Sequence, residues 1–289
     1  MKQLTVISGK GGTGKTSITA AFAALTDNAV LADCDVDAAD LHLLLDPAVE
    51  QTIDFTGLPV AAIDSDICTA CGLCREHCVF DAIDASFHVR REACEGCSVC
   101  AYVCPVDAIE MQPRTAGQAY ISSTRFGPMA HARLYAGEEA SGKLVALVRE
   151  QARDLAEEQG KKLVIIDGPP GIGCPVIAAI TGVDLVLAVT EPTLSAIGDL
   201  ERVLGVAAHF DIPAMVCINK HDINEENSER IATYCQNIDV PVVGRIPYDE
   251  TVTRAMVQGK TIVEYDNEGE TARRIRAMWQ QVQQRLDEP

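Results

Sequence analysis

The chain has 289 residues, with 24 Lys and Arg against 42 Asp and Glu, which gives a formal net charge of −18. A charge this negative argues against a protein that binds nucleic-acid backbones or anionic membranes through a basic surface. Apolar residues make up 47% of the sequence, but no apolar run reaches the roughly 18 residues that a membrane span needs. From the charge and the apolar runs we expect no nucleic-acid partner and no membrane span. The N-terminus shows no signal segment, so we also expect a cytoplasmic protein.

Short apolar runs alternate with helical patterns and predict an α/β fold with a doubly wound, mostly parallel sheet. The expected strands cover 3–8, 29–33, 162–167, 184–190, 214–219 and 241–246, and helices are expected over 15–25 and near 141–159. Ligands bind at the carboxyl ends of such strands. The loops after residues 8, 33, 167, 190 and 219 should therefore converge on one site.

Residues 60–112 interrupt this alternation. They hold eight cysteines, no lysine, and nine acidic residues against three arginines. We therefore expect an inserted domain over 60–112, with 1–59 and 113–289 together forming the main domain. The segment from Cys68 to Ile83 returns 26 residues later as Cys94 to Ile109, which indicates a duplicated unit.

Each half of this repeat has the spacing C-x2-C-x2-C-x3-C, and the segment resembles a bacterial ferredoxin with two [4Fe-4S] clusters. In that family the fourth cysteine of each run binds the cluster of the other run. The resemblance therefore implies Cys68, Cys71, Cys74 and Cys104 as ligands of one cluster, and Cys94, Cys97, Cys100 and Cys78 as ligands of the second. Val79 departs from the family pattern, since proline follows the last cysteine only in the second run, at Pro105. Structural zinc is the alternative, but it usually uses two separated C-x2-C pairs.

Residues 9–16, Gly-Lys-Gly-Gly-Thr-Gly-Lys-Thr, fit the phosphate-loop pattern G-x-x-x-x-G-K-[ST] between an expected strand and an expected helix. Its glycines let main-chain N–H groups surround phosphates, while Lys15 reaches the β and γ oxygens and Thr16 binds Mg²⁺. The expected nucleotide-binding residues of this loop are Gly9, Gly11, Gly12, Thr13, Gly14, Lys15, Thr16 and Ser17.

Lys10 in the same loop makes the chain resemble the MinD/ParA/Mrp branch of P-loop ATPases, which includes the nitrogenase iron protein and whose loop reads K-G-G-x-G-K-[ST]. The resemblance implies ATP hydrolysis with low basal activity and a nucleotide-dependent homodimer in which Lys10 contacts phosphates across the interface. It also implies that Asp35 orients the attacking water in switch I and that Asp167 lies near the metal in switch II. Lys10, Lys15, Asp35 and Asp167 are therefore the expected catalytic residues, whereas the role of Asp40 is open.

The sequence Asn219-Lys220-His221-Asp222 resembles the N-K-x-D of GTPases, whose carboxylate binds guanine. In the MinD/Mrp branch the asparagine instead meets adenine. We therefore expect Asn219, Asp222 and Pro247 to bind the base of ATP, with GTP as the alternative. The segments 190–193 and 247–249 are expected to line the same pocket.

The insert lies between the two switch segments, so we expect an ATPase that controls electron transfer through its clusters to a redox or acceptor protein. One alternative is an iron–sulfur cluster carrier, in which Cys174 binds a transient cluster at the dimer interface. Another is a positioning ATPase of the MinD/ParA kind with redox-sensing clusters. We expect Cys34, Cys217 and Cys235 to be buried thiols. The last helix, with apolar residues between Ile275 and Leu286, is expected to pack on the sheet and not to anchor in a membrane.

Overall fold

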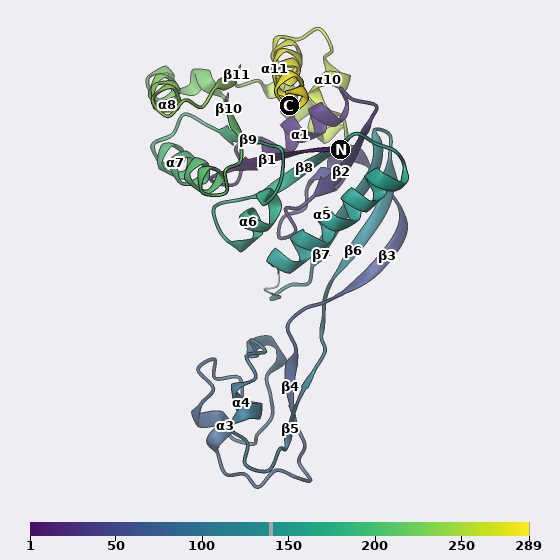
Figure 1. Ribbon diagram of the computed structural model, residues 1–289, viewed down its shortest axis with the longest axis vertical. Helices are drawn as coiled ribbons and strands as arrows, with labels where there is room; N and C mark the ends of the chain where they lie inside the picture. The colour runs from purple at the N-terminus through teal and green to yellow at the C-terminus, as the bar shows by residue number, and fades with distance from the viewer. Residues whose placement is uncertain (139–140, 289) are drawn as a thin grey trace. The chain divides into compact units, whose positions relative to one another are not determined.

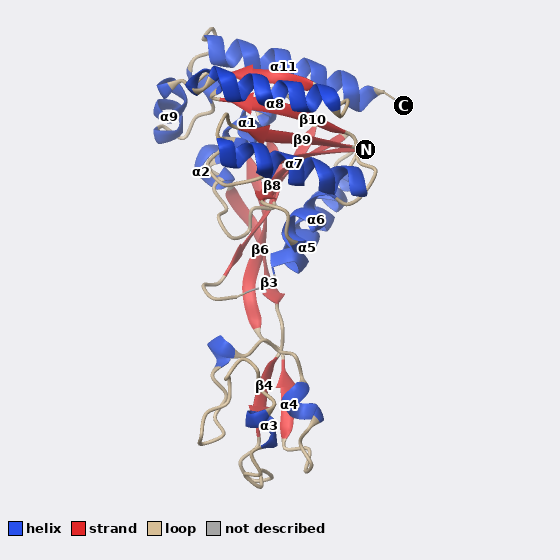
Figure 2. Cartoon of the chain, turned by 90° about the vertical axis from the view of Figure 1, so that its left-hand side faces the viewer, coloured by secondary structure: helices blue, strands red, loops and turns tan. Residues whose placement is uncertain are grey.

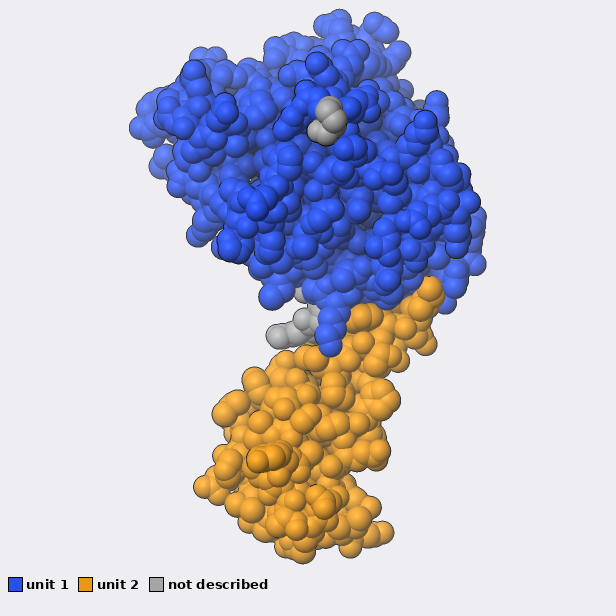
Figure 3. Space-filling model, viewed as in Figure 1, with its two compact units in different colours: residues 1–52, 119–133, 141–289 blue, residues 53–118, 134–140 orange. Residues whose placement is uncertain are grey.

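The computed structural model describes residues 1–138 and 141–288. The chain forms two compact units, shown in Figure 3: unit 1 comprises 1–52, 119–133 and 141–289, and unit 2 comprises 53–118 and 134–140. The chain leaves unit 1 within strand β3 (Ala48–Thr56) and returns to it within strand β6 (Thr115–Thr124). It leaves unit 1 again between residues 133 and 134, within strand β7 (Gly127–Leu134), so three of the crossings lie within strands.

The described residues of unit 1 are built on a large sheet with the strand order β11-β10-β9-β1-β8-β2-β7-β6-β3 (Figure 1). Strands β1, β2, β8, β9, β10 and β11 are parallel to their neighbours in this group, and β7 is parallel to β2. The remaining strand bounds are β1 Lys2–Ser8, β2 Ala29–Asp33, β7 Gly127–Leu134, β8 Leu163–Pro170, β9 Leu185–Thr190, β10 Ala214–Asn219 and β11 Val242–Ile246.

Two groups of helices cover this sheet (Figures 1 and 2). In one group α5 contacts α6, α7 contacts α8, and the four helices pack against β2, β8, β9 and β10. Their bounds are α5 Ser141–Glu158, α6 Cys174–Ile180, α7 Leu194–His209 and α8 Glu225–Asn237. The other surrounds α1: α1 Lys15–Ala23, α2 Leu41–Leu45, α9 Glu250–Val257, α10 Ile262–Tyr265 and α11 Glu270–Asp287. The predicted α/β fold with a large, mostly parallel sheet is confirmed.

All six strands expected from the sequence are present: β2 and β10 have the expected bounds, and the ends of the other four differ by at most three residues. Strands β3, β6 and β7 were not expected. β3 is exposed at nearly every position and β6 alternates only irregularly between buried and exposed residues. Of these three, only β3 is an edge strand, and a strand there has little to bury, so its sequence lacks the apolar pattern by which strands are recognised. β6 and β7 lie inside the sheet, and their buried residues follow no strict alternation.

Unit 2 contains a short antiparallel ladder of β4 (Val60–Ile63) and β5 (Ile109–Gln112), in which Val60 pairs with Gln112. The expected insert, 60–112, therefore begins and ends on facing residues of one ladder, and unit 2 extends beyond it on both sides. Two short helices, α3 (Leu73–Glu76) and α4 (Val99–Tyr102), start 26 residues apart and contact each other, and a 3-10 turn covers Arg91–Ala93. The sequence repeat is thus also a repeat of backbone structure.

Helix α11 lies along β11 and α1 with its apolar face buried. Trp279 is 3% exposed, and its ring centroid lies 4.6 Å from that of Phe22 in α1. The other buried residues of this face are Ile275, Met278, Val282 and Leu286. The expectation that the last helix packs on the sheet is confirmed. No helix in residues 1–138 or 141–288 has the length and apolar character needed to cross a membrane.

We expect Trp279→Ala to lower the free energy of unfolding by about 3–5 kcal/mol, because it leaves a cavity between α11 and α1. Val257→Ala is the matched control, since Val257 is 83% exposed and should change stability by less than about 0.5 kcal/mol. Urea unfolding followed by circular dichroism measures the stability of both variants. Tryptophan fluorescence does not serve here, because Trp279 is the only tryptophan in the chain and the first variant removes it. A loss below about 1 kcal/mol for Trp279→Ala would show that α11 contributes little to the core.

Candidate functional site

The phosphate loop lies between β1, which ends at Ser8, and α1, which begins at Lys15. Gly12 and Gly14 have φ angles of 78° and 89°, in the left-handed region that favours glycine. A Cβ atom on Gly14 would lie 2.3 Å from the Asn219 side chain, and one on Gly9 would lie 2.4 Å from Asp199. The backbone of this loop therefore requires three of the glycines that the pattern contains.

Lys15 is buried among carboxylates at the carboxyl ends of β2 and β8. Its Nζ lies 2.9 Å from Asp167 Oδ1 and 3.3 Å from Asp35 Oδ2. Burial by itself would lower the pKa of Lys15, but Asp167 and Asp35 outweigh that effect and raise it. The hydroxyls of Thr16 and Thr19 donate to Asp167 at 2.7 and 3.1 Å. Asp35 and Asp167, which lie far apart in the sequence, thus meet at one ammonium group.

Asp33 at the end of β2 is a functional candidate that the sequence analysis did not assign. Its carboxylate is fully buried and accepts from the N–H groups of Asp35 and Leu41, each at 3.2 Å. It therefore holds both ends of the loop 35–41, the segment expected to act as switch I. Burial, followed by the neighbouring Asp167 carboxylate, raises the pKa of Asp33 well above its ordinary value. Only the D-x-D spacing at this strand end could have indicated the role.

Lys10 forms an ion pair with Glu191, which follows β9, at 2.6 Å. The other Glu191 oxygen lies 3.2 Å from Lys220 Nζ, and Lys220 also donates to the Gly12 carbonyl at 3.1 Å. Burial raises the pKa of Glu191, but the hydrogen bonds from Lys10 and Lys220 outweigh it and lower the pKa overall. The loops after β1, β9 and β10 are thereby joined, as the convergence expected from the sheet requires.

The side chains expected to bind the base, Asn219 and Asp222, form hydrogen bonds with main-chain groups of the protein. Asn219 donates to the Thr13 carbonyl at 2.8 Å and accepts from Lys220 N–H at 3.0 Å. Asp222 accepts from the Tyr248 N–H at 2.7 Å. Both residues therefore shape the pocket walls, Asn219 through the phosphate loop and Asp222 through the segment after β11.

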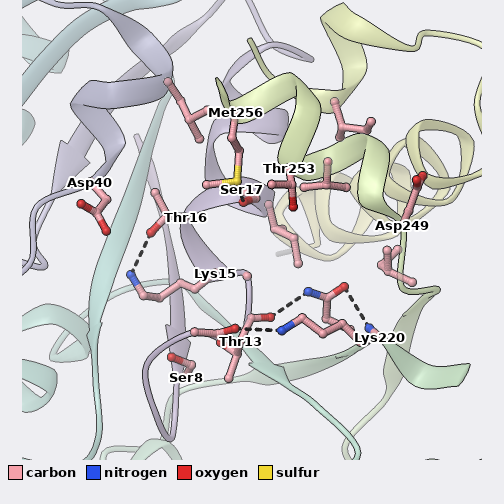
Figure 4. Close-up of a pocket in the computed structure, with 18 of the residues that line it drawn as sticks. Ser8, Thr13, Lys15, Thr16, Ser17, Asp40, Lys220, Asp249, Thr253 and Met256 are labelled. Carbon is pink, nitrogen blue, oxygen red and sulfur yellow. Dashed lines mark hydrogen bonds between the residues drawn. The ribbon is translucent and has the colours of Figure 1, made fainter. Parts of the chain in front are cut away.

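A cavity of about 480 Å³ joins these elements in unit 1 (Figure 4). Its polar side is formed by the phosphate loop from Gly11 to Ser17, with Asp35 and Asp40, and by Asn219 and the expected segment 247–249. Glu191 and Thr193 contact Lys10 instead of lining this cavity. The opposite wall is apolar and was not expected: it includes Leu43, Leu44, Val252, Met256 and Ile262. A size of this order suits a nucleotide-sized ligand.

In unit 2 the eight cysteines of the repeat separate into two groups. One small pocket is lined by Cys68, Cys71, Cys74 and Cys104, and another by Cys78, Cys94, Cys97 and Cys100. These are the two sets that the ferredoxin resemblance implies, and ligation itself stays a prediction. In the part of the chain that the structure describes, no group of three or more His, Cys, Asp or Glu is placed to hold one metal ion.

The backbone around these pockets follows the repeat. Positive φ angles occur at Ala70, Gly72 and Asp81, and again 26 residues later at Gly96, Ser98 and Asp107. The N–H groups of Ala82 and Ala108 donate to the sulfurs of Cys78 and Cys104 at 3.4 and 3.3 Å. Both halves thus repeat the same local backbone geometry around their cysteines.

The remaining cysteines differ from these in exposure. Cys34, Cys217 and Cys235 are buried, as expected. Burial raises the pKa of Cys217 to about 12 and that of Cys235 to about 11, so both are inert thiols. Cys174 is exposed at the first position of α6.

Residues 4–262 match the model of the CobQ/CobB/MinD/ParA nucleotide binding domain family. The chain belongs to this family. An uncharacterized protein of Methanocaldococcus jannaschii is 39% identical over 228 residues, which cover 78% of this chain and 80% of that protein. The septum site-determining protein MinD of Bacillus subtilis is 23% identical over 270 residues, with coverages of 90% and 81%.

Solved structures of MinD proteins share the fold. The cell division ATPase MinD of Pyrococcus furiosus gives a TM-score of 0.59 at 19% identity over 98% of each chain. Pyrococcus horikoshii MinD complexed with Mg-ADP gives 0.59 at 18% identity over 97% of this chain and 95% of that one. As a MinD/ParA-type protein, the chain is a nucleotide-binding, ATP-hydrolysing P-loop ATPase.

In this MinD/ParA-type ATPase we expect Asp33→Asn to reduce kcat by roughly ten- to a hundredfold, because Asp35 loses its fixed position. The amide can accept from only one of the two N–H groups that Asp33 binds. The Michaelis constant for ATP should change much less, since Asp33 does not line the cavity. Steady-state hydrolysis assays measure both constants.

Asp184→Asn is the control for this variant. Asp184 likewise accepts from a strand N–H, that of Gln3 at 2.7 Å, but at the opposite ends of the strands. Its replacement should leave kcat unchanged. Equal kcat values for Asp33→Asn and the wild type would contradict the positioning role.

Proposed function

We propose that this protein is an iron–sulfur ATPase in which ATP-driven changes of the switch segments and of a homodimer control electron transfer through two [4Fe-4S] clusters. The partner is a one-electron donor or acceptor protein. The observation that carries the proposal is the separation of the eight cysteines into two groups of four, each drawing on both halves of the repeat. That separation accompanies a P-loop ATPase in the same chain.

The residues of each pocket fit a cubane cluster. Four thiolates are the usual ligand set, and N–H groups directed at the sulfurs stabilise their charge and raise the reduction potential. Apolar side chains surround the first group, among them Ile63, Phe87, Val106 and Ile109. Each cysteine of a cubane binds a different iron, so the cysteine sulfurs lie further apart than the ligands of a single ion. Among the described residues no cysteines converge on one ion, and four cysteines around a pocket therefore suit a cubane better than zinc. When bound, each cluster stores one electron.

The nucleotide site supplies the other half of the proposal. The N–H groups of the phosphate loop bind the phosphates, and Lys15 turns from the carboxylates toward the β and γ oxygens. Mg²⁺, which the Thr16 hydroxyl and Asp167 would hold, neutralises phosphate charge. Asp35 orients the water that attacks the γ-phosphorus, and Lys10, freed from Glu191, contacts phosphates of the second subunit.

The pairing of two strands connects the start of switch I with a strand that enters unit 2. Strand β2 ends at Asp33 and pairs in parallel with β7, where Asp33 faces His131 in the register. Strand β7 then continues at Leu134 into unit 2. A displacement of switch I therefore acts on a strand that leads directly to the cysteine-containing unit, which supports coupling between nucleotide state and cluster environment.

The homodimer is supported by exposed apolar side chains in the connections after the central strands, which include the first residue of α7 and the 3-10 turn His221–Ile223. Ile172 follows β8, Leu194 follows β9 and Ile223 follows β10, and all three are exposed. These connections lie at the carboxyl edge of the sheet, the edge that also holds Lys10 and the phosphate loop. Apolar residues gathered at a charged edge are typical of a surface that a second subunit covers.

Two other functions have support from single observations. A cluster carrier is favoured by the exposed thiol of Cys174 in switch II. A positioning ATPase is favoured by the relatives named septum site-determining protein MinD. The carrier predicts cluster transfer to an apo-acceptor, and the positioning ATPase predicts a cellular location that changes with ATP.

Electron paramagnetic resonance of the anaerobically purified, reduced protein tests the proposal. We expect [4Fe-4S] signals that differ between the protein without nucleotide, with MgADP and with a non-hydrolysable MgATP analogue. Lys15→Ala should retain both clusters but lose the nucleotide dependence, because it lacks the cation that binds the γ-phosphate. Absence of iron and sulfide would contradict the clusters, and spectra indifferent to nucleotide would contradict the coupling.

Cys174→Ser separates electron transfer from the carrier function. Under the leading proposal this variant keeps the wild-type iron content, ATP hydrolysis and cluster spectra. Cys71→Ser, the replacement of another exposed cysteine, should instead remove about half of the iron, because it disables one ligand set. Iron analysis and transfer assays to an apo-ferredoxin measure these outcomes, and a loss of transfer confined to Cys174→Ser would favour the carrier.

A further inference from the structure

Arg125 lies in the turn between β6 and β7 and donates to three segments that are distant in the sequence. Its Nε and Nη2 donate to the two carboxylate oxygens of Glu264 at 2.8 and 2.9 Å. Nη2 also donates to the carbonyl of Leu44 at 2.6 Å and to that of Gly259 at 3.0 Å. The guanidinium stacks on Phe126, with 4.6 Å to the ring centroid. One side chain thus links the hairpin to α2, to α10 and to the turn between α9 and α10.

Two of these segments form the apolar wall of the nucleotide cavity. Leu44 of α2 and Ile262 of α10 both line it. Glu264 is part of the capping box of α10, in which it accepts from Thr261 N–H at 2.8 Å. Arg125 itself does not line the cavity. Arg125 therefore contacts the helices of the wall without lining the cavity.

The wall needs such support because its helices are short. Helix α2 has five residues and α10 has four, far below the length at which a helix is stable by itself. The last carbonyl groups of a helix lack intrahelical partners, and Arg125 supplies one for Leu44. A planar guanidinium can bind a carboxylate with two parallel bonds while it also reaches carbonyl oxygens, which an ammonium cannot do.

We propose that Arg125 is a positioning residue for nucleotide binding: it holds α2 and α10 in place and thereby makes the β6–β7 hairpin sensitive to whether the cavity is filled. The proposal rests on the ATPase site and not on the clusters, so it stands or falls independently of electron transfer. Because β6 and β7 both continue into unit 2, the hairpin is the segment through which occupancy of the cavity reaches the chain beyond unit 1.

Arg125→Lys tests the proposal, because it keeps the positive charge and removes the planar guanidinium that binds several acceptors at once. We expect the dissociation constant for MgADP, measured by calorimetry, to rise about tenfold, as the loss of charge-assisted hydrogen bonds predicts. The kcat at saturating ATP should stay within about twofold of the wild type, since the phosphate loop and Asp35 are untouched.

Arg149→Lys is the matched control. Arg149 in α5 also uses its guanidinium to bridge two carbonyls, those of Ala178 and Thr181, together with the Gln3 side chain. Its replacement should lower the melting temperature without changing MgADP affinity. Glu264→Gln provides a second variant that keeps Arg125 bonded to both carbonyls, and it should weaken MgADP binding by about threefold.

Hydrogen exchange gives a readout that a purely structural role would leave unchanged. MgADP should slow exchange of the amides of 119–133 in the wild type and in Arg149→Lys, but not in Arg125→Lys. Wild-type affinity in both Arg125→Lys and Glu264→Gln would overturn the proposal. Equal weakening of MgADP binding in Arg149→Lys would also overturn it, because the effect would then reflect general stability. If Arg125→Lys does not fold, the affinity of Glu264→Gln decides.

Discussion

The ion pair between Lys15 and the carboxylates at the ends of β2 and β8 is the interaction on which the site depends. One buried ammonium faces Asp167 at 2.9 Å and Asp35 at 3.3 Å, with Asp33 buried beside them. Such an arrangement is stable only when its charges are matched and hydrogen-bonded. The carboxylates outnumber the ammonium group, so the site suits a divalent cation. The phosphate loop beside it supplies N–H groups for the anion that accompanies this cation. Parallel pairing of β2 with β8, which sets Asp33 opposite Asp167, creates this charge arrangement.

The cavity beside this ion pair combines a rigid polar side with a weakly supported apolar side. The phosphate loop is held by the strand before it, the helix after it and Asn219. The apolar wall instead includes the short helices α2 and α10, of five and four residues, and Arg125 binds both of them. The proposal on Arg125 therefore assigns the response to occupancy to the wall and not to the phosphate loop.

The cysteine-containing unit obeys a different constraint. Its two halves place positive φ angles and N–H groups at positions 26 residues apart, so each half is a copy of the same set of turns. A unit this small buries few large apolar side chains and has only a short two-stranded ladder. Small domains of this kind usually gain stability from metal centres or cross-links. The arrangement is consistent with a unit whose fold and cofactor depend on each other.

The sequence by itself determined the elements whose signal is local: the phosphate loop with its glycines, the six apolar strands, the cysteine repeat and the packing face of α11. Each of these follows from residues close together along the chain, where spacing alone carries the information. The tertiary structure decided what depends on distant segments. It showed that Asp33 holds both ends of the loop 35–41, that Glu191 binds Lys10 and Lys220, and that Arg125 supports α2 and α10. It also added β3, which is exposed at nearly every position, and β6 and β7, whose buried residues follow no regular period. A charged side chain on a turn is compatible with many partners, and only the folded chain selects among them.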